Sequence, residues 1–358
     1  MRQLTADDIE ALAVGAWILG SGGGGSPYHG LLNLRRLYRD GARASLMAPE
    51  ELADGDDVAV VSMMGAPLVM QERLVDSRQI ARAVEAMQDH LGRKVRAVMA
   101  IEIGGGNGMQ PLMAAVHLGI PVVDADAMGR AYPEAQMTSF AVAGLTPAPL
   151  TSVDPRGTEA IISRAASWKW MERASRKLCT EFGSIAATCK APRTGADVKR
   201  WGIPHTTSQA IRLGEAVRAA RRRHEDPIDA ILHAERGKRL FSGKISAVER
   251  RTTEGFLRGR TTVQGLGDDR NSQAEIEFQN EWLVLWRDGV PIASTPDLIC
   301  LIDNDSGEAI GSETIRYGQR VTVIALPSPA IFLTPAGLDH VGPRAFGYDF
   351  DFRSVFSA

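Results

Sequence analysis

The most unusual stretch of the sequence is the loop Gly20-Ser-Gly-Gly-Gly-Gly-Ser-Pro27. Consecutive glycines let the backbone approach a ligand closely and leave N–H groups free, and a helix that starts at Pro27 adds the positive end of its dipole. The loop follows a predicted helix rather than a strand and lacks a Lys-Ser/Thr pair, so no nucleotide cofactor is expected. A plain turn between two helices is the alternative. The predicted ligand-binding glycines are Gly22, Gly23, Gly24 and Gly25.

A glutamate follows the predicted strand 95–101 and stands beside a second glycine cluster, in Glu102-Ile-Gly-Gly-Gly-Asn107. In an open parallel sheet the carboxyl ends of the strands form the crevice that binds ligands. Glu102 is therefore a candidate general base, or an acceptor for N–H groups of a ligand, with Asn107 beside it. A carboxylate that only caps the loop is the alternative.

Two aspartates and an arginine follow the next predicted strand, 120–123. Asp124 and Asp126 are two residues apart, so they can share a proton or a metal ion. Arg130 can pair with either aspartate, or it can hold a carboxylate of a ligand through two hydrogen bonds. A structural network of the aspartates and the arginine is the alternative.

A fourth cluster, Gly65-Ala-Pro67 followed by Glu72, comes after the predicted strand 57–63. Because the carboxyl ends of parallel strands share one edge, we expect the four clusters to converge on a single crevice. In the C-terminal half, Asp297 is a weaker candidate, because most carboxylates between strands accept hydrogen bonds from turns. The sequence does not decide whether four further residues reach the crevice, namely His205, Asn280, Glu281 and Asp303.

These clusters require an α/β scaffold to position them. Valine-rich strands alternate with predicted helices at 75–91 and 109–118, which favours an α/β domain with a mostly parallel sheet over residues 1–165. The chain is too long for one ordinary core, so a second domain is expected over 166–358. Its predicted parts are a helical connector over 166–237, a mainly β, barrel-like region over 238–335 and a tail over 336–358.

The composition excludes several classes of protein. With 41 basic and 43 acidic residues the net charge is −2, so the chain has no basic surplus for binding nucleic acid. Neither a run of about 18 apolar residues nor a secretory signal is visible, so a cytoplasmic protein without a membrane partner is expected. The three cysteines are widely spaced, which fits neither a disulfide framework nor a zinc site. The expected partner is a small molecule, whereas a divalent metal ion and a homo-oligomer are left open.

The order of these motifs resembles that of the S-methyl thiohydantoin desulfurase family. The motifs that carry the resemblance are the glycine loop, Met64-Gly-Ala-Pro, Glu102-Ile-Gly-Gly-Gly-Asn, Asp124-Ala-Asp-Ala-Met-Gly-Arg-Ala-Tyr-Pro-Glu, Gln279-Asn-Glu, Pro296-Asp-Leu-Ile and Arg316-Tyr-Gly. They extend over nearly the whole chain. The pair Pro204-His205 before a predicted helix departs from the family pattern, which bears on specificity rather than on the fold.

The resemblance implies an α/β N-terminal domain, a largely β C-terminal domain, and a hydrolase that acts on a five-membered thiohydantoin or hydantoin ring from amino-acid breakdown and releases a thiol. Such a reaction needs a carboxylate base with a raised pKa, donors for the developing negative charge, and an acid such as Glu134 or Asp126 for the sulfur. A non-catalytic subunit that binds a small molecule or a nucleotide is the alternative function. The candidate catalytic residues are Glu102, Asp124, Asp126 and Glu134, and the candidate substrate-binding residues are Gly22, Gly23, Gly24, Gly25, Glu72, Asn107, Arg130 and Asp297.

Overall fold

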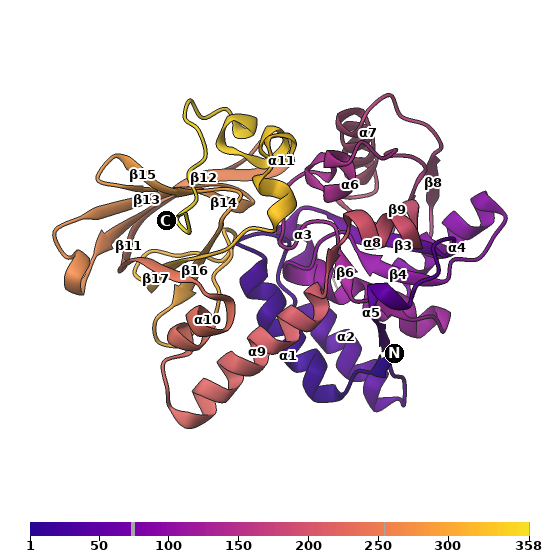
Figure 1. Ribbon diagram of the computed structural model, residues 1–358, viewed down its shortest axis with the longest axis horizontal. Coiled ribbons are helices and arrows are strands. Elements are labelled where there is room, and N and C mark those ends of the chain that lie inside the picture. Colours follow the sequence, from indigo (N-terminus) through magenta and orange to yellow (C-terminus); the bar gives the residue numbers. More distant parts are fainter. Residues whose placement is uncertain (73–75, 254, 358) are drawn as a thin grey trace.

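The structure is a computed structural model that describes residues 1–72, 76–253 and 255–357. Figure 1 shows two lobes side by side, an α/β lobe on the right and a lobe with an antiparallel sheet on the left. The predicted fold class is confirmed, because an α/β N-terminal domain is followed by a mainly β C-terminal domain. Among the described residues, no helix is long and apolar enough to cross a membrane.

Within the described chain, eight strands form the mixed sheet of the α/β lobe. Four neighbouring strands are parallel, and antiparallel strands extend both edges of this group. In spatial order the strands are β1 (Arg2–Gln3), β2 (Ser45–Met47), β5 (Val122–Val123), β4 (Ala97–Ala100), β3 (Asp57–Gly65), β9 (Ile185–Thr194), β7 (Leu150–Val153) and β8 (Glu159–Ile162). The valine-rich runs of the sequence are thus β3, β4 and β5, and the segments that follow them lie at one edge of the sheet.

The helices begin and end largely where capping residues predict. Thr5 forms a capping box with Asp8 at the start of the first helix, and Gly92 and Gly119 end two later helices in the left-handed conformation. The helices are α1 (Ala6–Leu19), α2 (Tyr28–Arg39), α3 (Pro67–Glu72), α4 (Gln79–Leu91), α5 (Gln110–Leu118), α6 (Ser139–Val142), α7 (Trp168–Glu181), α8 (Gly195–Trp201), α9 (Thr206–Arg223), α10 (Pro227–Glu235) and α11 (Pro335–Val341).

Strand β3 shows why the central strands are continuously apolar. Ala59 and Val61 pack into the core that contains α1, α4 and α5. The intervening Val58 and Val60 pack into a second core with Phe140 on the opposite face of the sheet. Because both faces are covered, side chains of both orientations must be apolar. Polar groups are therefore concentrated at the ends of these strands.

The segment 166–237, expected to be a helical connector, contains two described strands besides its helices, β9 and the short β10 (Ile203–Pro204). Strand β10 pairs with β6 (Ala125–Asp126) in a separate two-stranded sheet. Strand β9 lies inside the first sheet, where it pairs with β3 on one side and with β7 on the other. Its sequence, Ile185-Ala-Ala-Thr-Cys-Lys-Ala-Pro-Arg-Thr194, has few β-branched residues and no regular alternation, so local propensity does not indicate a strand. Pairing with two buried neighbours determines its conformation instead.

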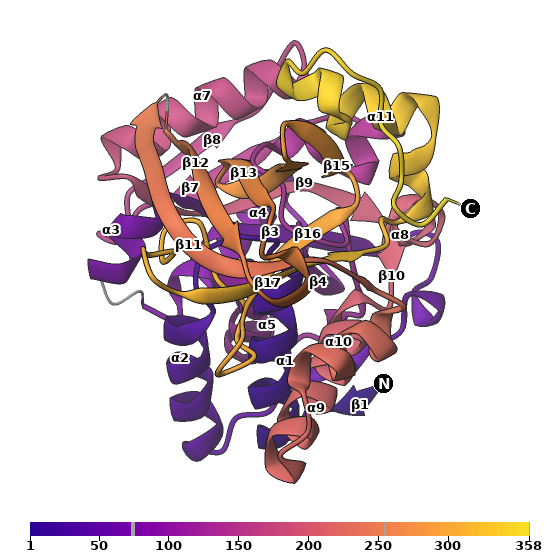
Figure 2. The same cartoon turned by 90° about the vertical axis from the view of Figure 1, so that its left-hand side faces the viewer.

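The second sheet is antiparallel throughout and is curled like half of a barrel (Figure 2). In spatial order its seven described strands are β15 (Val290–Ser294), β14 (Glu281–Arg287), β13 (Gln273–Gln279), β12 (Phe256–Gly265), β11 (Lys238–Thr253), β17 (Arg320–Leu326) and β16 (Leu298–Asp303). The predicted hairpin turn joins β14 to β15 through Asp288 and Gly289, which both have positive φ. The turn between β13 and β14 approaches the first lobe.

Arg130 joins the two lobes from a fully buried position. Its Nη1 donates hydrogen bonds to the carbonyl oxygens of Pro296 and Asp297, at 3.2 and 3.1 Å, and its Nη2 donates to the Oγ of Ser21 at 2.6 Å. The hydroxyl of Ser21 in turn donates to the carbonyl oxygen of Ile299. The guanidinium therefore ties the segment after β5, the glycine loop and the second sheet together.

We predict that Arg130→Met lowers the free energy of unfolding by about 3 kcal/mol or more, because several buried acceptors lose a charged donor at once. Urea denaturation followed by tryptophan fluorescence measures this change. The exposed Arg260, replaced by methionine, is the control and should cost less than about 1 kcal/mol. Equal losses in the two variants would show that Arg130 does not hold the lobes together.

Candidate active site

A small cavity of ≈ 100 Å³ lies between the two lobes. Both lobes line it. The first lobe contributes the glycine loop, the carboxyl ends of β3 and β4, helix α7 and strand β9, and the second lobe contributes the turn between β13 and β14. Its polar lining residues are Ser62, Glu102, Asn107, Tyr132, Glu134, Glu172, Arg176, Lys190, Asn280 and Glu281. A space of this size suits a small ring rather than a large cofactor.

Glu102 is buried at the carboxyl end of β4 and lines the cavity. Its Oε1 accepts a hydrogen bond from Nδ2 of Asn107 at 2.6 Å, and its Oε2 accepts one from the backbone N–H of Tyr132 at 3.1 Å. Burial raises the pKa of Glu102 to about 7, although these bonds and the charges of Lys190 and Arg130 oppose the increase. At neutral pH this carboxyl group therefore exists in both protonation states.

Glu281 faces the same cavity from the second lobe, at the start of β14. It is buried, and its Oε2 has no hydrogen-bond partner among the described residues. Burial and the nearby Glu102 raise the pKa of Glu281 well above its usual value, whereas Arg130 and the N–H of Gly24 lower it. Two like charges in one dry cavity disfavour each other, so one of the two glutamates keeps its proton.

Lys190 brings a buried positive charge to the cavity from β9. Its Nζ donates hydrogen bonds to the hydroxyls of Ser62 on β3 and of Thr188 on β9. Burial lowers the pKa of Lys190 to about 8, against the effect of Glu172 and Glu102. An ammonium group has three donors. Two are used by hydroxyls, and the third has no hydrogen-bond partner among the described residues.

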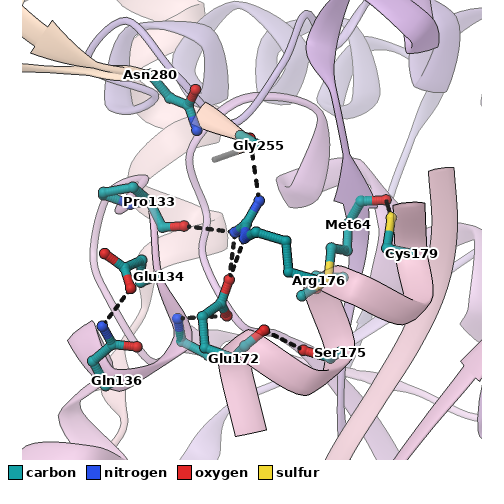
Figure 3. Close-up of polar contacts among 12 residues, drawn as sticks. Met64, Pro133, Glu134, Gln136, Glu172, Ser175, Arg176, Cys179, Gly255 and Asn280 are labelled. Atoms are coloured by element: carbon teal, nitrogen blue, oxygen red, sulfur yellow. Dashed lines mark hydrogen bonds and ion pairs between the residues drawn. The ribbon is translucent and has the colours of Figure 1, made fainter. Parts of the chain in front are cut away.

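A second charged group, Glu172 with Arg176, lies on α7 beside the cavity (Figure 3). Arg176 pairs with Glu172 and also donates to the carbonyl oxygens of Pro133 and Gly255, at 3.2 and 3.4 Å. The other carboxylate oxygen of Glu172 accepts the N–H of Ala135 at 3.2 Å. These contacts fix the chain that carries Glu134 along the cavity, and they reach across to the second lobe.

Asp124 and Asp126 lie outside the lining of the cavity. Asp124 accepts hydrogen bonds from the N–H and the hydroxyl of Ser208, in the first turn of α9. Asp126 accepts the N–H groups of Ile103 and Gly129, at 2.7 and 2.8 Å, and burial raises its pKa to about 8. Asp126 is thus occupied by backbone donors, one of them next to Glu102, whereas Asp124 accepts one backbone N–H and one hydroxyl.

Of the other residues predicted from the sequence, some line the cavity and some lie outside it. Glu134 lines the cavity, whereas Glu72 is exposed at the end of α3 and does not. Asp297 accepts hydrogen bonds from the C-terminal tail, and Asp303 accepts them from a turn after β16. His205 lies beside Asp124 with half of its side chain exposed. These three residues do not reach the cavity.

The glycine loop contacts the second lobe as well as the cavity, which Gly24 and Gly25 line. A Cβ on Gly22 would lie 2.4 Å from Nε1 of Trp282, and a Cβ on Gly23 would lie 2.0 Å from Oε1 of Glu281. A side chain at Gly22 would displace the indole of Trp282, and one at Gly23 would displace the side chain of Glu281. The loop therefore needs glycine partly because the second lobe packs directly on it.

Sequence reasoning missed Glu172, Arg176 and Lys190 and left Glu281 undecided. A lysine within the otherwise small and apolar stretch 185–191 was the available signal for Lys190. For Glu172 and Arg176, four residues apart on a helix, the sequence offers only an ordinary surface ion pair. Among the described residues, no three His, Cys, Asp or Glu side chains are placed to hold a metal ion.

The raised pKa of Glu102 predicts a pH-dependent effect on stability. Its value is about 7 in the fold and 4.5 in the reference state, so the wild type loses stability as the pH rises between these values. Glu102→Gln cannot ionise. The free energy of unfolding of the variant, taken relative to that of the wild type, should therefore rise by about 3 kcal/mol as the pH rises from about 5 to about 8. Urea denaturation at a series of pH values measures this difference. A difference that stays constant with pH would contradict the raised pKa.

Two family models match the chain and together cover nearly all of it. The S-Me-THD-like N-terminal domain matches residues 7–164, and the S-Me-THD-like C-terminal domain matches residues 166–355. A crystal structure of a protein from Chromobacterium violaceum has the same fold, with a TM-score of 0.86 and 24% sequence identity over 99% of this chain and 100% of that chain. No curated protein matches the sequence. From the two domain matches, the chain belongs to the S-Me-THD-like family.

Proposed function

We propose that the protein hydrolyses the C–S bond of an S-methylated thiohydantoin ring and releases methanethiol and a hydantoin. Membership of the S-Me-THD-like family supports the class of substrate. The observation that carries the proposal is the pair of buried glutamates, Glu102 and Glu281, which face one small cavity from different lobes. Two carboxyl groups whose environments separate their proton affinities are the usual arrangement for acid–base chemistry.

Glu102 is the base in this proposal. Its pKa of about 7 leaves a substantial ionised fraction at neutral pH while making the carboxylate a stronger base than an exposed one. A water molecule held by Glu102 attacks the ring carbon that carries the sulfur, and Glu102 takes one of its protons. The new C–O bond converts this carbon into a tetrahedral centre, with negative charge developing on the adjacent ring nitrogen.

Glu281 is the acid. Its proton passes to the sulfur as the C–S bond breaks, so the thiol leaves in neutral form. The C–OH group then shifts its proton to the ring nitrogen to give the hydantoin carbonyl. The proton that Glu102 holds restores Glu281, and the net reaction consumes one water molecule.

Lys190 supplies the positive charge that the intermediate needs. Its free N–H donor is directed by two hydroxyl partners, Ser62 and Thr188, so little reorganisation is required when charge develops on the ring. No step of this mechanism requires Asp124 or Asp126, which lie outside the lining of the cavity.

We predict that Glu102→Gln and Glu281→Gln each lower kcat by about 10²- to 10⁴-fold, the usual contribution of a general acid or base. Release of free thiol, together with loss of the ultraviolet band of the S-methylated ring, measures turnover. Glu313→Gln is the matched control, because Glu313 is also buried with a pKa raised to about 7 but lies outside the cavity. Ring binding without turnover in the wild type would support the non-catalytic function instead.

The pH profile of kcat/KM should be bell-shaped. Below about 7 the base Glu102 is protonated, and above about 8 Lys190 loses its charge, so the maximum is expected between these values. Lys190→Met should lower the maximum and remove the limb near pH 8, whereas Lys190→Arg should move that limb to higher pH. An alkaline limb that is unchanged in both variants would exclude Lys190 from the reaction.

A further inference from the structure

A second cavity, of ≈ 320 Å³, adjoins the reaction cavity, and we call it the side chamber. The two spaces share five lining residues, namely Gly24, Gly25, Met63, Met70 and Asn107. Helices α2 and α5 supply most of the remaining lining. The side chamber is larger than the space that a small ring needs, and nothing in the proposed reaction uses it.

The side chamber offers no permanent charge among the described residues of its lining. Asp, Glu, Lys and Arg do not occur among the described residues that line it. Three methionines, Met63, Met70 and Met113, give it flexible thioether surfaces, which make favourable contacts with aromatic rings. A charged group placed there would lose its hydration without gaining an ion pair.

Two lining residues offer acceptors for hydrogen bonds. Gln110 is buried, and its Nε2 donates to the carbonyl oxygen of Gly106 at 3.3 Å, which leaves Oε1 without a partner among the described residues. His29 Nδ1 lies 3.1 Å from the carbonyl oxygen of Met70. Because a carbonyl oxygen only accepts, Nδ1 must carry the hydrogen, and Nε2 of the neutral imidazole is then an acceptor.

We propose that the side chamber binds the side-chain substituent of the ring substrate, and that this substituent is an uncharged aromatic group with an N–H or O–H donor. Phenol and indole have this chemistry. The thioethers contact the aromatic body, and Oε1 of Gln110 accepts the donor. This inference rests on the proposed function, since that function places the five-membered ring in the adjoining cavity.

The first experiment compares S-methylated thiohydantoins prepared from glycine, phenylalanine, tyrosine, tryptophan and glutamate. We expect kcat/KM to be roughly tenfold higher for the tyrosine- or tryptophan-derived ring than for the phenylalanine-derived ring, because a buried acceptor stays unpaired in the latter case. The glycine-derived ring leaves the chamber unfilled and should be a poorer substrate than all three aromatic ones. A preference for the glutamate-derived ring would overturn the proposal.

The second experiment removes the acceptor by Gln110→Met. The variant should bind phenylalanine- and tyrosine-derived rings equally, so the roughly tenfold preference disappears. Gln88→Met is the matched control, because Gln88 is a buried glutamine on α4 that lies outside both cavities and accepts the N–H of Val95. The Gln88→Met variant should keep the preference for the tyrosine-derived ring over the phenylalanine-derived ring, even if the substitution lowers its stability. A preference that survives Gln110→Met would overturn the role of Gln110.

Calorimetric binding of the corresponding hydantoins to the wild-type protein separates this inference from the proposed reaction. Selective binding of tyrosine- or tryptophan-derived hydantoins without turnover of any S-methylated ring would retain the side chamber and overturn the hydrolysis. Turnover without selectivity among the substituents would retain the hydrolysis and overturn the role of the side chamber. Absence of both binding and turnover for every ring would overturn both.

Discussion

The buried guanidinium of Arg130 is the contact on which the arrangement of the two lobes depends. A charge removed from water is costly unless it is well compensated. Here the compensation comes from carbonyl oxygens of the second lobe, from the hydroxyl of Ser21 in the glycine loop, and at longer range from the ionised form of Glu102. Since these groups come from both lobes, the charge is satisfied only when the lobes are docked.

The same docking brings ionisable groups of both lobes into one cavity. Desolvation is the largest cause of the shifted pKa values of Glu102, Glu281 and Lys190. Glu281 reaches this cavity from the second lobe, whereas the hydrogen-bond partners of Glu102 and Lys190 belong to the first lobe. The second lobe thus supplies a carboxyl group whose pKa is raised both by burial and by the nearby Glu102 of the first lobe.

The sequence predicted the scaffold better than the site. Apolar periodicity and capping residues determine α1, α4 and β3 locally, and the hairpin at Asp288 and Gly289 follows from turn chemistry alone. Strand β9 was missed because its conformation comes from its neighbours in the sheet. In the sequence, several carboxylates stand next to glycines, and the sequence does not distinguish their roles. Only the fold shows that Glu102 faces a cavity, whereas Asp126 accepts hydrogen bonds from the surrounding backbone.

Strand β9 also has a consequence for how the chain can be divided. The family models meet between residues 164 and 166, yet β9 lies beyond that point and pairs with both β3 and β7. A fragment that ended there would lose the strand that attaches β7 and β8 to the sheet, and it would leave the long apolar β3 as an unpaired edge prone to self-association. The boundary recognised in sequences is therefore not a boundary of autonomous folding, and recombination at this point would exchange parts of one sheet rather than whole modules.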